Sequence, residues 1–167
     1  MDIYATKYVA LATRPMTQEE QSHRDTARAL KTPTPEAIAT ASAALAPLID
    51  APCYLVPVPD SKGGLAANLE LARAIAKLVP GARVKIAVGR SHPVESSCAR
   101  RLRGQAGLTI EEHAITRTAG PMLPIPVHFV DNIATTGNTI AACRRALGWG
   151  SGLTYADAST RTNQPRL

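Results

Sequence analysis

Polar segments and short apolar runs alternate along the chain, beginning with two helical patterns. Residues 17–30 are polar and suit a helix, because Thr17 and Glu20 have the spacing of a capping box. A second helix is predicted after Thr34, since Pro35 suits a first helical position and apolar residues then recur at helical spacing. We therefore expect residues 1–50 to form a helical part that packs against a sheet.

A strand, a helix and a second strand are predicted next. The run from Pro52 to Pro59 is apolar, short and bounded by prolines, which is typical of a buried strand. Leu65–Val79 carries an apolar face at helical spacing, and Arg83–Gly89 has the pattern of another strand. A unit of this kind predicts a right-handed crossover and a parallel sheet.

The last part of the chain combines an irregular segment with a second unit. Residues 90–124 are basic and weakly periodic, so we expect a mobile arm with a short helix around Glu95 to Leu102. Ile125–Val130 then predicts a strand, and Asn138–Leu147 predicts a helix after a polar turn. A final strand is expected within Leu153–Ala158.

The amino-acid composition favours the same arrangement of helices and strands. The 167 residues are 45% hydrophobic and 19% charged, which suits one globular domain and excludes a disordered chain. Only 4% are aromatic, so aliphatic strands covered by helices are favoured over a sandwich of aromatic-rich sheets. The sequence predicts an α/β fold over residues 1–167, a single Rossmann-like domain with a mostly parallel sheet flanked by helices.

The charge narrows the class of partner. The net charge is +6, and the segment from Arg83 to Arg103 holds six Lys and Arg residues against one acidic residue, Glu95. Such a block indicates a phosphate-rich partner. A nucleic acid and a small phosphorylated substrate would use the same field, so charge alone leaves both open.

The cysteines and the N-terminal pattern bear on the compartment. Cys53, Cys98 and Cys143 are isolated, and their spacing does not resemble a zinc site. The first residues lack a basic segment followed by an apolar one, and no stretch has the length needed to span a bilayer. We expect a cytoplasmic protein with no membrane partner.

The segment with the clearest chemistry is Val127–Ile140. An apolar strand ends in Asp131 and Asn132, a turn rich in hydroxyl groups follows, and a helix then begins. The N-terminus of a helix presents N–H groups and a favourable dipole to an anion, and Gly137 lets the backbone approach it closely. Since Asp131 and Asn132 can bind sugar hydroxyls, the segment predicts a site for a sugar phosphate.

This segment resembles a known signature. Val130–Thr139 is similar to the phosphoribosyl pyrophosphate motif of type I phosphoribosyltransferases, in which apolar residues lead into two acidic residues and then Thr-Thr-Gly-x-Thr. Val56–Pro59 with Asn68 downstream, and Gln105–Thr109, resemble the ComF-type branch of that family. The resemblance covers residues 52–158, which it implies to be the core of the domain.

The resemblance implies a fold of the phosphoribosyltransferase type and a transfer reaction. The protein would bind phosphoribosyl pyrophosphate with Mg²⁺ and move the phosphoribosyl group to a nitrogenous base, releasing diphosphate. The catalytic positions would be Asp131 and Asn132. The ribose phosphate would contact Ala134, Thr135, Thr136, Gly137, Asn138 and Thr139. The diphosphate would contact Asp60, Ser61, Lys62, Gly63 and Arg90. Mg²⁺ would be carried by the substrate and not by a set of protein ligands.

Two residues depart from the family pattern and keep other functions open. Asn132 replaces the second acidic residue, and His113 stands where an arginine is expected. One alternative is a non-catalytic sensor of a phosphoribosyl ligand, or a nucleic-acid-associated protein of the competence type, that keeps the pocket. A hydrolase is a third. Residues 1–50 could supply a hood that selects the base, and a homodimer is usual in the family.

Overall fold

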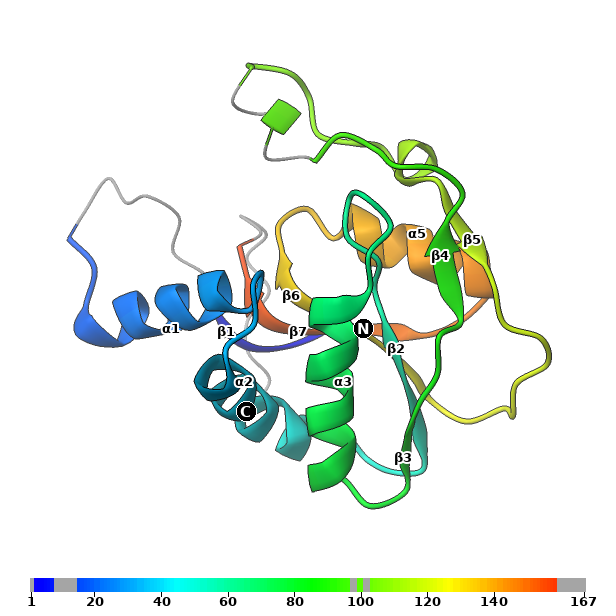
Figure 1. The fold of residues 1–167 in the computed structure, drawn as a ribbon, viewed down its shortest axis with the longest axis horizontal. Coiled ribbons are helices and arrows are strands. Elements are labelled where there is room, and N and C mark those ends of the chain that lie inside the picture. Colours follow the sequence, from blue (N-terminus) through cyan, green and yellow to red (C-terminus); the bar gives the residue numbers. More distant parts are fainter. Residues whose placement is uncertain (1, 8–14, 97–98, 101–102, 159–167) are drawn as a thin grey trace.

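The computed structural model describes residues 2–7, 15–96, 99–100 and 103–158 (Figure 1). The helices are α1 (Gln18–Ala29), α2 (Pro35–Leu45), α3 (Ala66–Leu78) and α5 (Asn138–Leu147), with short 3₁₀ helices η1 (Ala46–Leu48) and η2 (Glu111–His113). The strands are β1 (Ile3–Lys7), β2 (Cys53–Pro57), β3 (Ala82–Val84), β4 (Val88–Arg90), β5 (Ile115–Arg117), β6 (Val127–Ala134) and β7 (Ser151–Asp157).

Five of the strands form one parallel sheet in the order β1-β7-β6-β2-β3. The registers place Val56 of β2 beside Phe129 of β6, and Val130 of β6 beside Leu153 of β7. β4 and β5 form a separate antiparallel pair. The prediction of an α/β fold with a mostly parallel sheet flanked by helices is confirmed, and the arrangement is compatible with a Rossmann-like fold.

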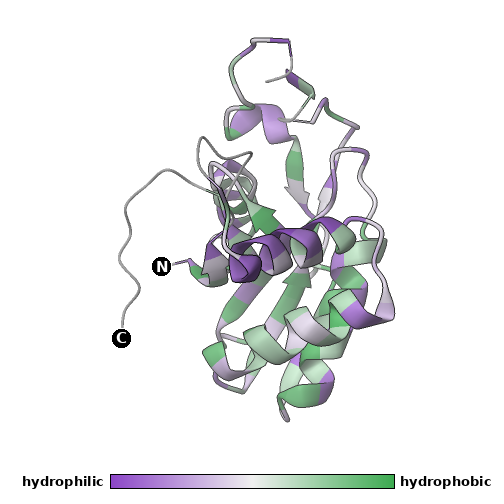
Figure 2. Ribbon diagram, turned by 90° about the vertical axis from the view of Figure 1, so that its left-hand side faces the viewer, coloured by the Kyte–Doolittle hydropathy of each residue, from purple (hydrophilic) through white to green (hydrophobic). Residues whose placement is uncertain are grey.

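Both faces of the sheet are covered. Every residue of β2 is buried, and alternate side chains enter different apolar clusters, Leu55 with α1, α2 and α3, and Val56 with α5. Figure 2 shows the sheet strands as largely hydrophobic and the outward face of α1 as hydrophilic. Burial of the strands on both faces is what a parallel sheet between helices requires.

The predicted helix starts are confirmed by their hydrogen bonds. The Thr17 hydroxyl accepts a hydrogen bond from Glu20 N at 3.1 Å, and Thr17 N donates to the Glu20 carboxylate at 2.9 Å. The Thr34 hydroxyl accepts from Ala37 N at 3.2 Å at the start of α2. These side chains satisfy N–H groups that have no partner within their own helix.

Two strand predictions need correction. The prediction for residues 1–50 named only helices, yet β1 lies at the sheet edge and pairs with β7, with Tyr4 beside Thr154. The single strand expected at Arg83–Gly89 is instead β3 and β4, which belong to different sheets. Lys85 N still donates a hydrogen bond to Leu55 O of the main sheet. Beyond Lys85 the chain leaves this sheet, and Ala87 and Val88 are buried against β5 and α5.

The segment from Arg90 to residue 124 holds more regular structure than expected. β5 pairs with β4, and η2 precedes it. The helix expected around residues 95–102 overlaps positions 97–98 and 101–102, which lie outside the described residues. β6 is longer than predicted and continues through Asp131 to Ala134, because its pairing with β7 continues to Asp157.

No helix in the described part of the chain combines the length and the apolar character that a membrane crossing needs.

Candidate functional site

A cavity of about 350 Å³ opens where β2 and β6 end. The carboxyl ends of neighbouring parallel strands meet at one edge of the sheet, which is where α/β folds bind ligands. Seven of the predicted site residues line this cavity: Asp60, Ser61, Arg90, Asp131, Asn132, Thr135 and Thr139. The loop after β2 and the turn between β6 and α5 therefore contribute to one site.

The other predicted residues lie beside the cavity without lining it. They are Lys62, Gly63, Ala134, Thr136, Gly137 and Asn138. The Thr136 hydroxyl accepts a hydrogen bond from Asn138 N at 3.3 Å, and Gly137 precedes α5 with a left-handed φ of 76°. Asn138 Nδ2 donates to Leu108 O at 2.7 Å, so this side chain joins α5 to the segment that precedes η2.

Asp131 is a half-buried carboxyl group held by two donors. Its Oδ1 accepts hydrogen bonds from Asn68 Nδ2 at 3.2 Å and from Asn132 N at 2.9 Å. Burial raises the pKa of Asp131 to about 6, against the opposing effect of these two hydrogen bonds and of Arg90. The carboxylate is therefore ionised at neutral pH in surroundings that oppose its charge.

Asn132 turns one side of its amide toward its own strand. Its Oδ1 accepts a hydrogen bond from Ile133 N at 2.9 Å. Among the described residues, nothing accepts a hydrogen bond from its Nδ2. The donor half of the amide is therefore the part that a ligand in the cavity can use, and it suits a hydroxyl oxygen.

Asp60 shapes the loop after β2. Its Oδ1 accepts hydrogen bonds from Lys62 N and from Gly64 N, both at 2.8 Å. Asp60 N and Gly64 O close the loop at 2.8 Å, with Gly63 in a left-handed conformation between them. The Asp60 carboxylate thus accepts hydrogen bonds within its own loop. Ser61 is the residue of this loop that offers a hydroxyl group to the cavity.

Arg90 joins two segments of the site. Its Nε donates to Asp60 O, and its Nη1 donates to His113 O in η2. Burial lowers the pKa of Arg90, with Asp60 and Asp131 acting in the opposite direction. Two of its nitrogens are therefore committed to backbone carbonyls, and Nη2 is the one left for an anion.

His113 lies at the cavity as a buried imidazole, only 3% exposed. Its Nδ1 is 3.5 Å from the Thr139 hydroxyl, and its Nε2 has no hydrogen-bond partner among the described residues. Burial, with the Arg90 charge as a second cause, lowers the pKa of His113 to about 4. The imidazole is therefore neutral at physiological pH.

Sequence reasoning left several lining residues out of the predicted site. They are Lys31, Pro59, Ala67, Asn68, Ser96, Leu108 and His113. The resemblance to the family pattern could have identified Asn68 and His113, since both occupy positions of that pattern. No sequence signal indicates Lys31, because it lies between two helices and reaches the cavity only through the packing of those helices on the sheet.

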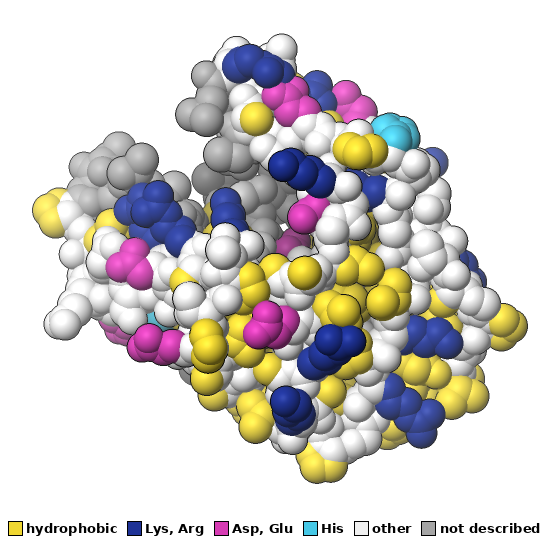
Figure 3. All heavy atoms as spheres, in the orientation of Figure 1, with side chains coloured by type: hydrophobic (Ala, Val, Ile, Leu, Met, Phe, Trp, Pro, Cys, Tyr) yellow, Lys and Arg dark blue, Asp and Glu magenta, His cyan; other side chains and the backbone are white. Residues whose placement is uncertain are grey.

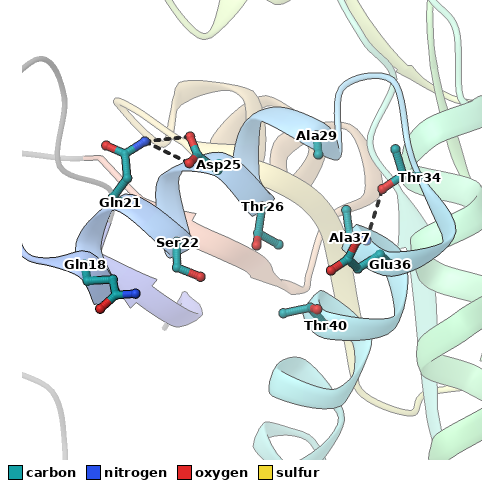
Figure 4. Close-up of a pocket in the computed structure, with 10 residues that line it drawn as sticks. All are labelled: Gln18, Gln21, Ser22, Asp25, Thr26, Ala29, Thr34, Glu36, Ala37 and Thr40. Carbon is teal, nitrogen blue, oxygen red and sulfur yellow. Dashed lines mark hydrogen bonds between the residues drawn. The ribbon is translucent and has the colours of Figure 1, made fainter.

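A second hollow, of about 520 Å³, lies between α1 and α2 (Figure 4). Its side chains are mainly amides and hydroxyls, and several serve the helices themselves. Gln21 donates to the Asp25 carboxylate at 2.8 Å, and Thr34 caps α2. None of the predicted site residues lines it.

The described residues contain no group of three or more His, Cys, Asp or Glu side chains placed to hold a metal ion. Of the cavity's two carboxylates, Asp60 is engaged in its loop and Asp131 accepts two hydrogen bonds. No protein-family model matches the chain, and no curated protein matches it.

Proposed function

We propose that the protein is a phosphoribosyltransferase of the type I fold, which binds phosphoribosyl pyrophosphate with Mg²⁺ and transfers the phosphoribosyl group to a nitrogenous base. One observation carries the proposal. Asp131, Thr135 and Thr139, from the segment that resembles the signature, line the same cavity as Ser61 and Arg90. A diol-binding carboxylate beside hydroxyl donors and a guanidinium suits a ligand with a ribose, a phosphate and a diphosphate.

The reaction would break the bond between the anomeric carbon and the diphosphate oxygen. Its electron pair leaves with the diphosphate, and a nitrogen lone pair of the base forms the new bond. Positive charge grows on the ribose ring as negative charge grows on the leaving group, so both need stabilisation. Asp131, ionised at neutral pH, serves the first charge, and Arg90 with the substrate's Mg²⁺ serves the second.

The remaining residues would orient the substrate. Thr135 and Thr139 supply hydroxyl donors to the ribose phosphate at the start of α5, where the helix dipole also favours an anion. Asn132 donates from Nδ2 to a ribose hydroxyl. The segment that carries η2 lies at the cavity through His113, where it would help to keep water from the donor.

Two measurements test the proposal. Binding to the folded state alone at about 100 times the dissociation constant adds roughly 2.7 kcal/mol of stability, so phosphoribosyl pyrophosphate with Mg²⁺ should raise Tm clearly. Diphosphate release is then measured with a panel of purine, pyrimidine and pyridine bases. Absence of both a Tm shift and diphosphate release would overturn the proposal.

A ligand sensor without turnover is the second candidate, and Asn132 favours it. An amide in place of the second carboxylate keeps hydrogen bonding to the ribose but removes charge that would stabilise the cation. A Tm shift with phosphoribosyl pyrophosphate, without diphosphate release for any base, would identify the sensor.

The face of the molecule in Figure 3 gives little support to nucleic-acid binding. Lys and Arg side chains are spread over the face in Figure 3 between apolar and acidic ones, and they do not form one continuous basic patch there. Its test is the salt dependence of DNA affinity, since phosphate contacts require a steep decline with added salt.

A further inference from the structure

Lys31 is a cation at the cavity to which the sequence patterns assign no role. It lies in the turn between α1 and α2, and its side chain is exposed. The turn is fixed by Leu30, which is 2% exposed in the core, and by Lys31 N, which donates to Arg28 O at 3.1 Å. The backbone is therefore held in place while the ammonium group is not engaged by any described acidic residue.

Lys31 reaches the cavity from a different side than the predicted phosphate-binding segments. The helices α1 and α2 contact β1 and β7, on one side of β6, whereas the loop of Asp60 follows β2 on the other side. In Figure 1 the connection between α1 and α2 lies to the left of the top of α3, and the loop after β2 lies above α3. Both line one cavity, so they face each other across the end of β6.

Of the Lys and Arg side chains that line the cavity among the described residues, Lys31 has the more available charge and Arg90 the less available one. Arg90 already donates to Asp60 O and to His113 O. Lys31 influences Asp131 only at longer range, as a weak contribution that lowers the pKa of that carboxyl group. An ammonium group with no carboxylate partner at a ligand cavity suits an anionic group of the ligand.

The cavity also lacks the usual means of holding a neutral base. No Phe, Tyr or Trp of the described residues lines it, and its apolar members are Pro59, Ala67 and Leu108. Stacking of a flat ring on an aromatic side chain is therefore absent from this part of the chain. Recognition of the acceptor must then rely on polar groups and charge.

We propose that Lys31 binds a carboxylate on the acceptor, so that the acceptor is a nitrogen heterocycle that carries an acidic group. The inference rests on the proposed function. The ribose phosphate is assigned to the β6–α5 turn and the diphosphate to the loop after β2 with Arg90. The side of the cavity at Lys31 is thereby left for the third component of the reaction, the base.

The experiment compares acceptors that differ by one carboxylate. Calorimetry in the presence of phosphoribosyl pyrophosphate and Mg²⁺ measures the affinity of pyridine-3-carboxylate against pyridine-3-carboxamide, and of orotate against uracil. Diphosphate release gives kcat/KM for the same pairs. We expect the wild-type protein to favour the acid in at least one pair, and Lys31→Met to lose that preference by about 10- to 100-fold, the range of a charge-assisted hydrogen bond.

Two further variants sharpen the result. Lys31→Arg keeps the charge and should retain most of the preference. Lys77→Met removes an exposed lysine of α3 that does not line the cavity. It should change neither the affinity for the acid acceptors nor that for the neutral ones. The KM for phosphoribosyl pyrophosphate should move less than about twofold in Lys31→Met, because the donor's anions are held elsewhere.

The outcomes separate the inference from the proposed function. If the wild-type protein uses acid and neutral acceptors equally, the inference is overturned while the transfer reaction stands. The same holds if Lys31→Met prefers the acid as strongly as the wild-type protein does. Loss of donor affinity instead of acceptor preference overturns it as well. If diphosphate is never released, calorimetry still decides, since failure of the wild-type protein to bind either acid would refute the role of Lys31.

Discussion

Burial and the proposed function make opposite demands on the charge of Asp131. Its pKa is raised to about 6 from an ordinary value of 3.8, chiefly by burial. Because the folded-state pKa lies above the unfolded one, the stability that this group contributes is fully present below pH 3.8 and is lost as pH rises through about 6. At neutral pH the ionised carboxylate therefore destabilises the fold, a cost expected where a buried charge serves the proposed chemistry.

Asp131→Asn should separate these demands. The amide oxygen can still accept from Asn68 Nδ2 and Asn132 N, so the geometry is kept while the charge is removed. We expect the free energy of unfolding to rise by about 1–2 kcal/mol at pH 8, with no gain near pH 4, and binding or turnover of phosphoribosyl pyrophosphate to be lost. Urea denaturation at both pH values checks this, and equal stability of the two proteins at pH 8 would contradict it.

His113 has the opposite pH dependence. Its pKa is lowered from 6.5 to about 4, mainly by burial, so its contribution to stability is full above pH 6.5 and is lost as pH falls toward 4. His113→Gln removes this titration. Relative to the wild-type protein, the variant should therefore gain stability as pH falls from 6.5 to 4, by about 1 kcal/mol or more. A constant difference between the two urea curves over this range would show that the imidazole does not titrate with folding.

At the scale of elements, Arg90 connects the end of β4 to the loop after β2 and to η2. It donates to Asp60 O and to His113 O, which belong to segments 53 residues apart along the chain. A lysine has one nitrogen and cannot satisfy both carbonyls in the same geometry. The loop and η2 are thus held together by a single guanidinium, beside the position where the diphosphate is proposed to bind.

Arg90→Lys should loosen both segments. We expect about 1–2 kcal/mol of lost stability, faster hydrogen exchange at residues 60–64 and 111–114, and weaker binding of phosphoribosyl pyrophosphate. Arg117→Lys is the matched control, because Arg117 donates to Ala119 O and Gly120 O, both at 2.9 Å, and does not line the cavity. If the control lost ligand affinity to the same extent, the effect would be general and not due to the Arg90 contacts.

The elements that the sequence predicted well are those whose signals are local. Thr17 with Glu20, and Thr34 with Pro35, mark helix starts because their hydrogen bonds lie within three residues. β1 and the division between β3 and β4 escaped prediction, because each depends on a partner far along the chain. The same reason applies to the site: a contiguous motif located Asp131 and Thr139, whereas Lys31 required the packed helices.

At the scale of the whole molecule, the first described residue is bound to the last third of the chain. Asp2 Oδ1 accepts a hydrogen bond from Gly152 N at 2.7 Å, and its carboxylate also forms an ion pair with Arg144. Gly152 permits this approach, since a Cβ there would lie 3.3 Å from the Asp2 side chain and 3.0 Å from Ile140. The contact fixes β1 beside β7, and β7 would otherwise be an edge strand with unpaired backbone groups.

Asp2→Ala and Asp2→Asn should therefore differ. Alanine removes both interactions and should lower the free energy of unfolding by about 1–2 kcal/mol. Asparagine keeps an oxygen that accepts from Gly152 N and loses only the ion pair, whose side chains are 40% and 47% exposed, so its cost should stay below about 0.5 kcal/mol. Urea denaturation gives the two energies, and hydrogen exchange at residues 151–157 reports whether β1 still protects β7. Equal losses in the two variants would mean that the ion pair, and not the hydrogen bond to Gly152, holds the N-terminal strand in the sheet.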